Sequence, residues 1–274
     1  MHLADTHCHL DHPKFDPDRA EVLARARQAG VERILIPGVS LDSSRAAARI
    51  AAAGGGLHAA VGVHPTELAG WEPGSVAELE QLGRLQQVVA VGEIGLDYYW
   101  EAAPHELQRS ALEAQLELAS RLGLPVVVHL REKGDAERGP CFTDGLQVLA
   151  AWTEGLRQAG HPLAARPGVL HSFSGDRPGA ELAIELGFRI GVTGPVTYRA
   201  GRQALFAVLP LEDLLLETDA PFLAPLPQRG GRNEPAWVRW IADKIAEIHQ
   251  VNVEEVGRIT SGNASRLFQW EEPL

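Results

Sequence analysis

Short apolar segments recur along the chain and alternate with stretches of helical spacing. Several of these segments are nearly continuous hydrophobic runs, which is typical of parallel strands that are buried on both faces. The pattern predicts eight strands, at residues 3–7, 33–37, 57–63, 88–93, 125–130, 168–173, 188–192 and 214–218.

The stretches between the predicted strands carry apolar residues at helical spacing. Residues 16–30 end on a glycine, and residues 104–123 begin with a proline and also end on a glycine, which are typical helix boundaries. Strands that alternate with helices predict a parallel α/β sheet, and eight such units favour closure into a (β/α)8 TIM barrel. The sequence contains no tandem repeat, low-complexity tract or linker, so we expect one domain over residues 1–274.

Two connections are longer than a minimal barrel requires. Residues 132–144 are polar, contain glycine and proline, and follow the fifth strand on the side where the strands end. This stretch is interpreted either as part of a rim or lid over a site or as a tolerated surface insertion. Residues 158–167 precede the sixth strand.

The composition is that of an ordinary globular protein. A chain of 274 residues with 45% apolar residues can bury a core without disulfides, and Cys8 and Cys141 are too few for a disulfide framework. The polar start of the sequence argues against a signal peptide, and no apolar run approaches the ~20 residues that cross a bilayer. We therefore expect a soluble, cytoplasmic protein with no membrane contact.

The chain is acidic, with 25 Lys and Arg against 36 Asp and Glu and a formal net charge of −11. Tight, nonspecific binding of duplex DNA depends on basic side chains that neutralise phosphates, so this charge argues against it. A nuclease is not excluded, because bound metal ions can supply positive charge inside a site.

The first candidate for chemistry is a His-x-His pair at the end of the first predicted strand. His7 and His9 are two positions apart, so their side chains point to the same side of the strand, where they can bind one metal ion. Cys8 points the other way and is expected to pack as a small hydrophobic residue. Taken alone, the pair is weak evidence for a metal site.

Other predicted strands also end in residues that bind metals. The third strand ends at His64, the fourth at Glu93, the fifth at His129, the sixth at His171, and Asp219 follows the eighth. In a barrel these ends converge on one face, where the catalytic groups of this fold collect. Structural residues scattered at random would rarely align in this way, so we predict a metal centre.

Without His64, which is not required as a ligand, four histidines and two carboxylates remain. They exceed the needs of one tetrahedral zinc ion and suit two ions about 3.5–4 Å apart. Neighbouring strands group the ligands: one ion is expected at His7, His9 and Asp219, and the other at His129 and His171, with Glu93 as the bridge. Nitrogen-rich ligation favours zinc, manganese or another transition ion over a purely oxygen-liganded magnesium site, and the identity of the ions stays open. The ions would activate a water molecule, and Asp219 can accept its proton as general base.

Further residues have both a functional and a structural interpretation. His64 either contacts a substrate phosphate or makes a structural hydrogen bond, and Asp5 and Asp97 either orient ligating histidines or cap loops. The cluster Tyr98, Tyr99 and Trp100 either stacks nucleobases or packs on the barrel rim. Five arginines follow the fifth, seventh and eighth strands and can reach phosphates or lie in solvent: Arg131, Arg199, Arg202, Arg229 and Arg232. The histidines without a strand-end position are interpreted as structural or surface residues: His2, His12, His58, His105, His161 and His249.

The sequence resembles the TatD family of metal-dependent deoxyribonucleases, within the amidohydrolase superfamily. The matching segments run nearly end to end: DTHCHLD at 5–11, GVHP at 62–65, GEIGLDYYW at 92–100, VVHLRE at 127–132, HSFSG at 171–175, ETDAPFLAP at 217–225, RNEP at 232–235 and NASRLF at 263–268. The resemblance implies a TIM barrel with the same six ligands and divalent-metal hydrolysis of phosphodiesters, often as a 3′–5′ exonuclease on DNA. The 132–144 stretch departs from the family pattern, in which the fifth strand runs more directly into a helix. Related superfamily members bridge the ions with a carboxylated lysine, and Glu93 takes that place here.

Three functions remain open at this point. The leading hypothesis is a two-metal phosphodiesterase that trims single-stranded or damaged DNA ends and needs no obligate protein partner. The second is a two-metal deacylase or esterase that acts on a D-aminoacyl-tRNA or on a small ester or amide, because the same activated water serves both reactions. The third is a non-catalytic binding protein, which the complete ligand set disfavours.

Overall fold

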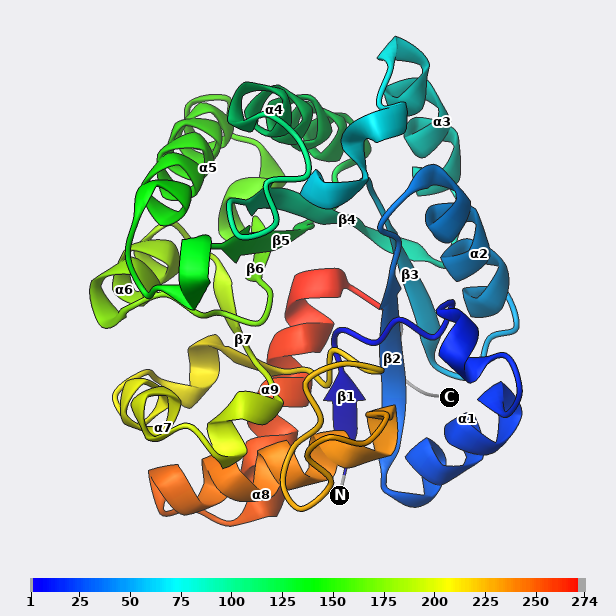
Figure 1. Ribbon diagram of the computed structural model, residues 1–274, viewed down its shortest axis with the longest axis vertical. Helices are drawn as coiled ribbons and strands as arrows, with labels where there is room; N and C mark the ends of the chain where they lie inside the picture. Colours follow the sequence, from blue (N-terminus) through cyan, green and yellow to red (C-terminus); the bar gives the residue numbers. More distant parts are fainter. Residues whose placement is uncertain (1, 271–274) are drawn as a thin grey trace.

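Eight parallel strands lie side by side in sequence order in the computed structural model, which describes residues 2–270 (Figure 1). The strands are β1 Leu3–Asp5, β2 Val31–Pro37, β3 Leu57–Val61, β4 Val88–Asp97, β5 Val126–Arg131, β6 Gly168–Leu170, β7 Arg189–Val192 and β8 Leu214–Leu216. Each pair of neighbours is parallel. All eight predicted strands are therefore confirmed, although their ends differ.

Hydrogen bonds beyond the end of β1 join the first strand to the last. The Thr6 N–H donates to the Leu216 carbonyl at 3.0 Å, and the Asp219 N–H donates to the His7 carbonyl at 2.9 Å. Cys8 and Ala220 form a further parallel bridge. The sheet thus closes on itself, and the predicted TIM barrel is confirmed.

Helices surround the barrel (Figure 1). The helices are α1 Arg19–Gln28, α2 Leu41–Ala51, α3 Pro73–Gly83, α4 His105–Leu122, α5 Pro140–Gln158, α6 Arg177–Glu185, α7 Ala200–Phe206, α8 Val238–His249 and α9 Val253–Phe268. Short 3-10 helices occupy several connections: η1 Pro13–Phe15, η2 Pro65–Gly70, η3 Lys133–Asp135, η4 Pro162–Ala165, η5 Gly194–Thr197, η6 Leu211–Asp213 and η7 Pro235–Trp237. Within residues 2–270, no helix has the length and apolar character needed to cross a membrane.

The predicted 132–144 connection is shorter than the sequence pattern indicated. Helix α5 begins at Pro140, so the connection is only residues 132–139 and contains the 3-10 helix η3. The buried carboxylate of Glu132 accepts a hydrogen bond at 2.8 Å from the N–H of Cys141, in the first turn of α5. A proline at the first helical position and an acceptor for a free N–H both favour a helix start there.

Two other element boundaries also differ from the prediction. The first helix begins at Arg19 rather than at residue 16, because Pro13–Phe15 forms the separate 3-10 helix η1. Strand β4 continues past Glu93 to Asp97, because it stays paired with β5 as far as the partners Asp97 and Arg131.

Helix α9 closes the amino end of the barrel. Its Asn263 side chain donates to the carbonyls of Leu211 and Leu214, where β8 begins. Phe268 at the end of α9 belongs to an apolar cluster with side chains from the strands. The cluster contains Ala4, Leu35, Ala60, Val89, Ala90, Val127, Val169, Leu215, Ala264, Leu267, Phe268 and Trp270.

Candidate metal centre

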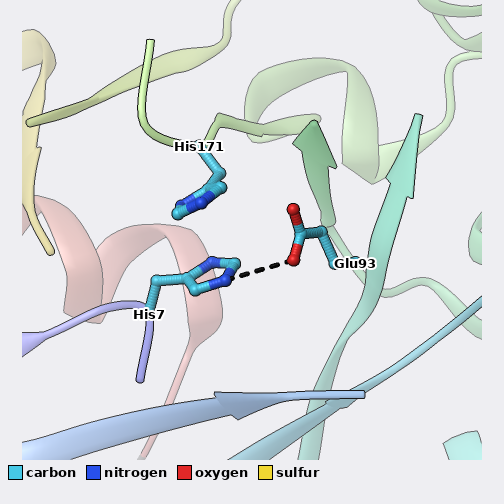
Figure 2. A group of neighbouring side chains, drawn as sticks. All are labelled: His7, Glu93 and His171. Atoms are coloured by element: carbon cyan, nitrogen blue, oxygen red, sulfur yellow. Dashed lines mark ion pairs between the residues drawn. The ribbon is translucent and has the colours of Figure 1, made fainter. Parts of the chain in front are cut away.

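The predicted ligands gather at the carboxyl end of the barrel. His7 and His9 follow β1, Glu93 lies within β4, and His171 directly follows β6. Figure 2 shows Glu93 and His171 converging with His7 from three different parts of the sheet. His129 in β5 and Asp219 after β8 complete the set of six.

Glycines on both sides of Glu93 allow β4 to lie unusually close to β5. A Cβ atom on Gly92 would lie 2.6 Å from the Val127 Cβ atom, which no real Cβ tolerates. A Cβ atom on Gly95, which has φ +148°, would lie 1.9 Å from the His129 carbonyl oxygen. The Gly-Glu-Ile-Gly sequence therefore brings Glu93 and His129 together, because only glycine fits at these two positions.

A buried network holds Asp219 in place. Asp219 has a positive φ of 55°, an uncommon conformation for a residue with a side chain, which persists only where the surroundings enforce it. The Asp5 carboxylate accepts hydrogen bonds from the N–H and the hydroxyl of Thr218, at 2.9 and 2.6 Å. Asn233 donates to the carbonyls of Thr218 and Phe222. Asp5 thus caps the loop that carries Asp219, and its one contact with a histidine among the described residues is the His7 backbone N–H, which donates to Oδ1 at 3.3 Å.

The two carboxylate oxygens of Glu93 face different groups of histidines. Oε2 lies 3.2 Å from His7 Nε2, the contact marked in Figure 2, and 3.9 Å from His9 Nε2. Oε1 lies 3.0 Å from His129 Nδ1 and 3.6 Å from His64 Nε2. A carboxylate in this position can bind one ion through each oxygen, as the predicted bridge requires.

Three groups of side chains within residues 2–270 bring their ligand atoms within 4.8 Å of one another. They are His7 with His9 and Asp219, His7 with Glu93 and His171, and His64 with Glu93 and His129. The first is the group expected for one ion. His171 lies with His7 rather than with His129, and the ring centroids of His7 and His171 are 3.4 Å apart. His64, which sequence analysis did not require as a ligand, lies with His129.

Two buried carboxylates orient histidines of the candidate centre. Asp97 Oδ2 lies 3.0 Å from His129 Nε2, so the Nδ1 atom of that ring faces Glu93. Glu217 Oε2 lies 2.8 Å from His171 Nδ1, so the Nε2 atom faces Asp219, 3.7 Å away. Such partners fix the ring orientation and tautomer of a metal-binding histidine. The Asp97 interpretation came from the sequence, whereas Glu217 was missed, although its position two residues before Asp219 in the ETDAP segment was a usable signal.

The electrostatics of the cluster suit a cation. Burial tends to raise the pKa of Glu93, but the surrounding charges of His7 and His64 hold it well below its ordinary value. Burial likewise opposes ionisation of Asp219, but a hydrogen bond to His9 and the charge of His171 keep its pKa low. Both carboxylates are therefore ionised near neutral pH. With converging imidazole nitrogens beside them, such as His7 Nε2 and His9 Nε2 at 3.2 Å, the donor set fits divalent ions such as zinc or manganese.

The cluster lies in a cavity of about 990 Å³. Its walls include the side chains of His64, Trp100, Arg131, Arg199 and Arg202, and also His12, which had been interpreted as structural or surface. The guanidinium of Arg202 is buried and donates hydrogen bonds to the Glu137 carboxylate and to the carbonyls of Phe173 and Gly175.

Several candidate substrate residues lie outside the cavity lining. Tyr98 is only 3% exposed, and its hydroxyl donates to Asp144 at 2.8 Å while its ring stacks on His105. Arg232 pairs with Asp18, and the guanidinium of Arg229 lies over the ring of Tyr198. The structure therefore brings His64 and Arg131 to the metal centre but not Tyr98.

Comparisons with known proteins agree with the fold and identify the family. Residues 4–269 match the family described as TatD related DNase. The chain is 34% identical over 269 residues to the uncharacterized metal-dependent hydrolase YabD of Bacillus subtilis, covering 97% of this chain and 99% of that protein. It is 36% identical over 275 residues to the 3′-5′ ssDNA/RNA exonuclease TatD of Edwardsiella piscicida, with 97% and 99% covered. The crystal structure of YjjV, a TatD homolog from Escherichia coli, superposes with a TM-score of 0.86 at 34% identity and covers 98% of both chains.

Proposed function

The chain belongs to the family of TatD related DNases and is a metal-dependent hydrolase, and from this premise we propose that it is a 3′–5′ exonuclease that removes nucleotides from single-stranded or damaged DNA ends. One observation carries the proposal. The two oxygens of Glu93 face two different sets of histidines at the floor of an open cavity. A relative of similar length is named as an exonuclease on single-stranded DNA and RNA, which favours a nucleic-acid substrate over an ester.

The residues divide the work of phosphodiester hydrolysis among them. Two divalent ions, zinc, manganese or magnesium, would be held on the two sides of Glu93. His7, His9 and Asp219 are available on one side, with His171 beside His7, and His129 and His64 are available on the other. Bound there, such ions polarise a phosphoryl oxygen and lower the pKa of water. Asp219 takes the proton from the attacking water, because its ionised carboxylate lies at the edge of the cluster facing the cavity.

Other cavity residues bind the substrate. Arg131 and Arg199 line the cavity and offer guanidinium donors to phosphates, which arginine recognises well. Because the overall charge is −11, the attraction for a polyanion comes from these side chains and the ions rather than from the protein surface. We propose a cytoplasmic, single-domain enzyme that needs no protein partner.

The direct test uses protein purified without chelators. Metal analysis should show more than one divalent ion per chain, and single-stranded DNA labelled at its 5′ end should shorten stepwise from the 3′ end when Mn²⁺ or Mg²⁺ is added. The same oligonucleotide with label at the 3′ end should release labelled mononucleotide first, whereas release of longer fragments would indicate internal cleavage. If DNA stays intact while a D-aminoacyl-tRNA or a small ester is hydrolysed, the nuclease proposal is wrong and a deacylase is favoured.

A further inference from the structure

Trp100 is a large apolar side chain on the wall of the cavity that holds the candidate metal centre. Its side chain is 62% exposed, the highest exposure among the large exposed hydrophobic residues of the described chain. It lies in the connection between β4, which ends at Asp97, and α4, and lines the same cavity as Glu93 and His129. An exposed indole on a cavity wall offers a large apolar face to a ligand bound there.

The backbone under Trp100 is held firmly. The N–H groups of Tyr99 and Trp100 both donate to Asp97 Oδ1 at 2.9 Å. Gln108 accepts from the Asp97 N–H at 2.8 Å and donates to the Ala103 carbonyl at 2.9 Å, and so ties both ends of the connection to α4. The exposed ring therefore sits on a rigid support and not on a loose loop.

One carboxylate connects this support to the metal centre. Asp97 uses Oδ1 to hold the backbone of Trp100 and Oδ2 to orient His129, at 3.0 Å from its Nε2 atom. The position of the indole is thereby set relative to a metal ligand by the two ends of a single side chain.

The side chains of Tyr99 and Arg131 pack near the Trp100 ring. The Tyr99 ring meets the Trp100 ring edge to face, with centroids 4.9 Å apart. The guanidinium of Arg131 lies 3.9 Å from the centre of the Tyr99 ring and 5.7 Å from that of Trp100, and its Nε atom donates to Asp135. An aromatic ring with a guanidinium beside it is a suitable surface for a nucleobase next to a phosphate.

We propose that Trp100 stacks on a nucleobase adjacent to the scissile phosphodiester and so makes the enzyme favour unpaired ends. The inference rests on the nuclease function proposed above. A base inside a duplex has both faces covered by neighbouring base pairs, whereas an unpaired base can place one face on the indole. Stacking is tolerant of base identity, so the expected preference is for the presence of a base and not for its sequence.

The test compares two single-stranded substrates with the metal-loaded enzyme. One carries a base in both nucleotides that flank the scissile bond, and the other has an abasic tetrahydrofuran residue at either of these positions. We expect the wild type to prefer the base-bearing end by about tenfold in kcat/KM, within the range that stacking provides. This preference should fall to near one in Trp100→Ala and be largely kept in Trp100→Phe. Val208→Ala, which truncates another exposed apolar side chain (49% exposed) outside the cavity, should keep the wild-type preference.

Two results would overturn the proposal: an unchanged preference in Trp100→Ala, or no preference in the wild type. A second measurement separates this outcome from failure of the nuclease proposal. Tryptophan fluorescence is titrated with a phosphorothioate oligonucleotide, and the quenching should be much smaller in Trp100→Phe than in the wild type. Quenching that depends on Trp100 without any DNA hydrolysis would refute the nuclease function and keep the stacking site. Hydrolysis with quenching that does not depend on Trp100 would refute the stacking site alone.

Discussion

The two ends of the barrel are built from the same eight strands but have opposite chemistry. At the carboxyl end, buried imidazoles and carboxylates face one another, and Glu93 lies between two groups of histidines. At the amino end, small and branched apolar side chains from the strands pack on Phe268 and Trp270. We therefore expect the polar groups of the carboxyl end to be stabilised by a bound ion, whereas the apolar packing of the amino end requires no ligand.

This difference assigns catalysis and stability to opposite ends of the barrel. Burying ionisable groups costs free energy unless they are paired, so a bound cation is expected to add to the stability of the carboxyl end. The apolar amino end supplies stability that the carboxyl end lacks. Substitutions at the two ends should accordingly change different measurable properties.

The largest effect is expected for Glu93→Gln at the carboxyl end. The amide keeps the shape of the side chain but removes the charge that faces both groups of histidines, so transition-state stabilisation of several kcal/mol is lost and activity falls about a thousandfold or more. Metal content per chain and kcat on single-stranded DNA give the measurement. Circular dichroism of the variant should match that of the wild type. Turnover within tenfold of the wild type would contradict the bridging role.

The next effect is expected at the opposite end, for Phe268→Ala. Phe268 is 3% exposed, and removing a buried phenyl ring costs about 3–5 kcal/mol of unfolding free energy. Urea unfolding should show this loss, while the metal content and kcat of the folded fraction stay near wild-type values. A fall in kcat as large as the one expected for Glu93→Gln would show that the two ends are not independent.

Removal of metal should destabilise the protein through the carboxyl end alone. An ion at a hundred times its dissociation constant stabilises the folded state by about 2.7 kcal/mol, so dialysis against a chelator should lower the thermal midpoint by several degrees. Adding Zn²⁺ or Mn²⁺ back should restore the midpoint, and the same increment should be found in Phe268→Ala. A midpoint that does not respond to chelation would contradict the metal centre.

A smaller effect is expected for Glu217→Gln, beside the cluster. The amide still fills the space next to His171 but no longer offers a charged acceptor to its Nδ1 atom, so metal affinity should fall about 10–100-fold. Competition with a fluorescent chelator measures this affinity. Saturating metal should recover most of the activity, in contrast to Glu93→Gln. An unchanged affinity would assign Glu217 a purely structural role, through its contacts with Thr6 and the Ser172 N–H.

The sequence was sufficient to predict the barrel and to place the candidate metal ligands at one end of it. Parallel strands that are buried on both faces appear in the sequence as nearly continuous apolar runs, and the residue at the end of each run can be identified from the sequence. Because the carboxyl ends of barrel strands meet on one face, His7, Glu93, His129, His171 and Asp219 could be placed together from their strand-end positions alone.

Tertiary structure decided which neighbours of these ligands reach the site. Tyr98 and Trp100 are two residues apart and equally aromatic, yet Tyr98 is buried against His105 and Asp144 while Trp100 lines the cavity. Glu217 contacts His171 although the two are 46 residues apart in the chain. Burial and contact partners depend on how separate elements pack. A local sequence pattern predicts on which face of its own strand a side chain lies, but it does not predict which residues of other elements contact that side chain.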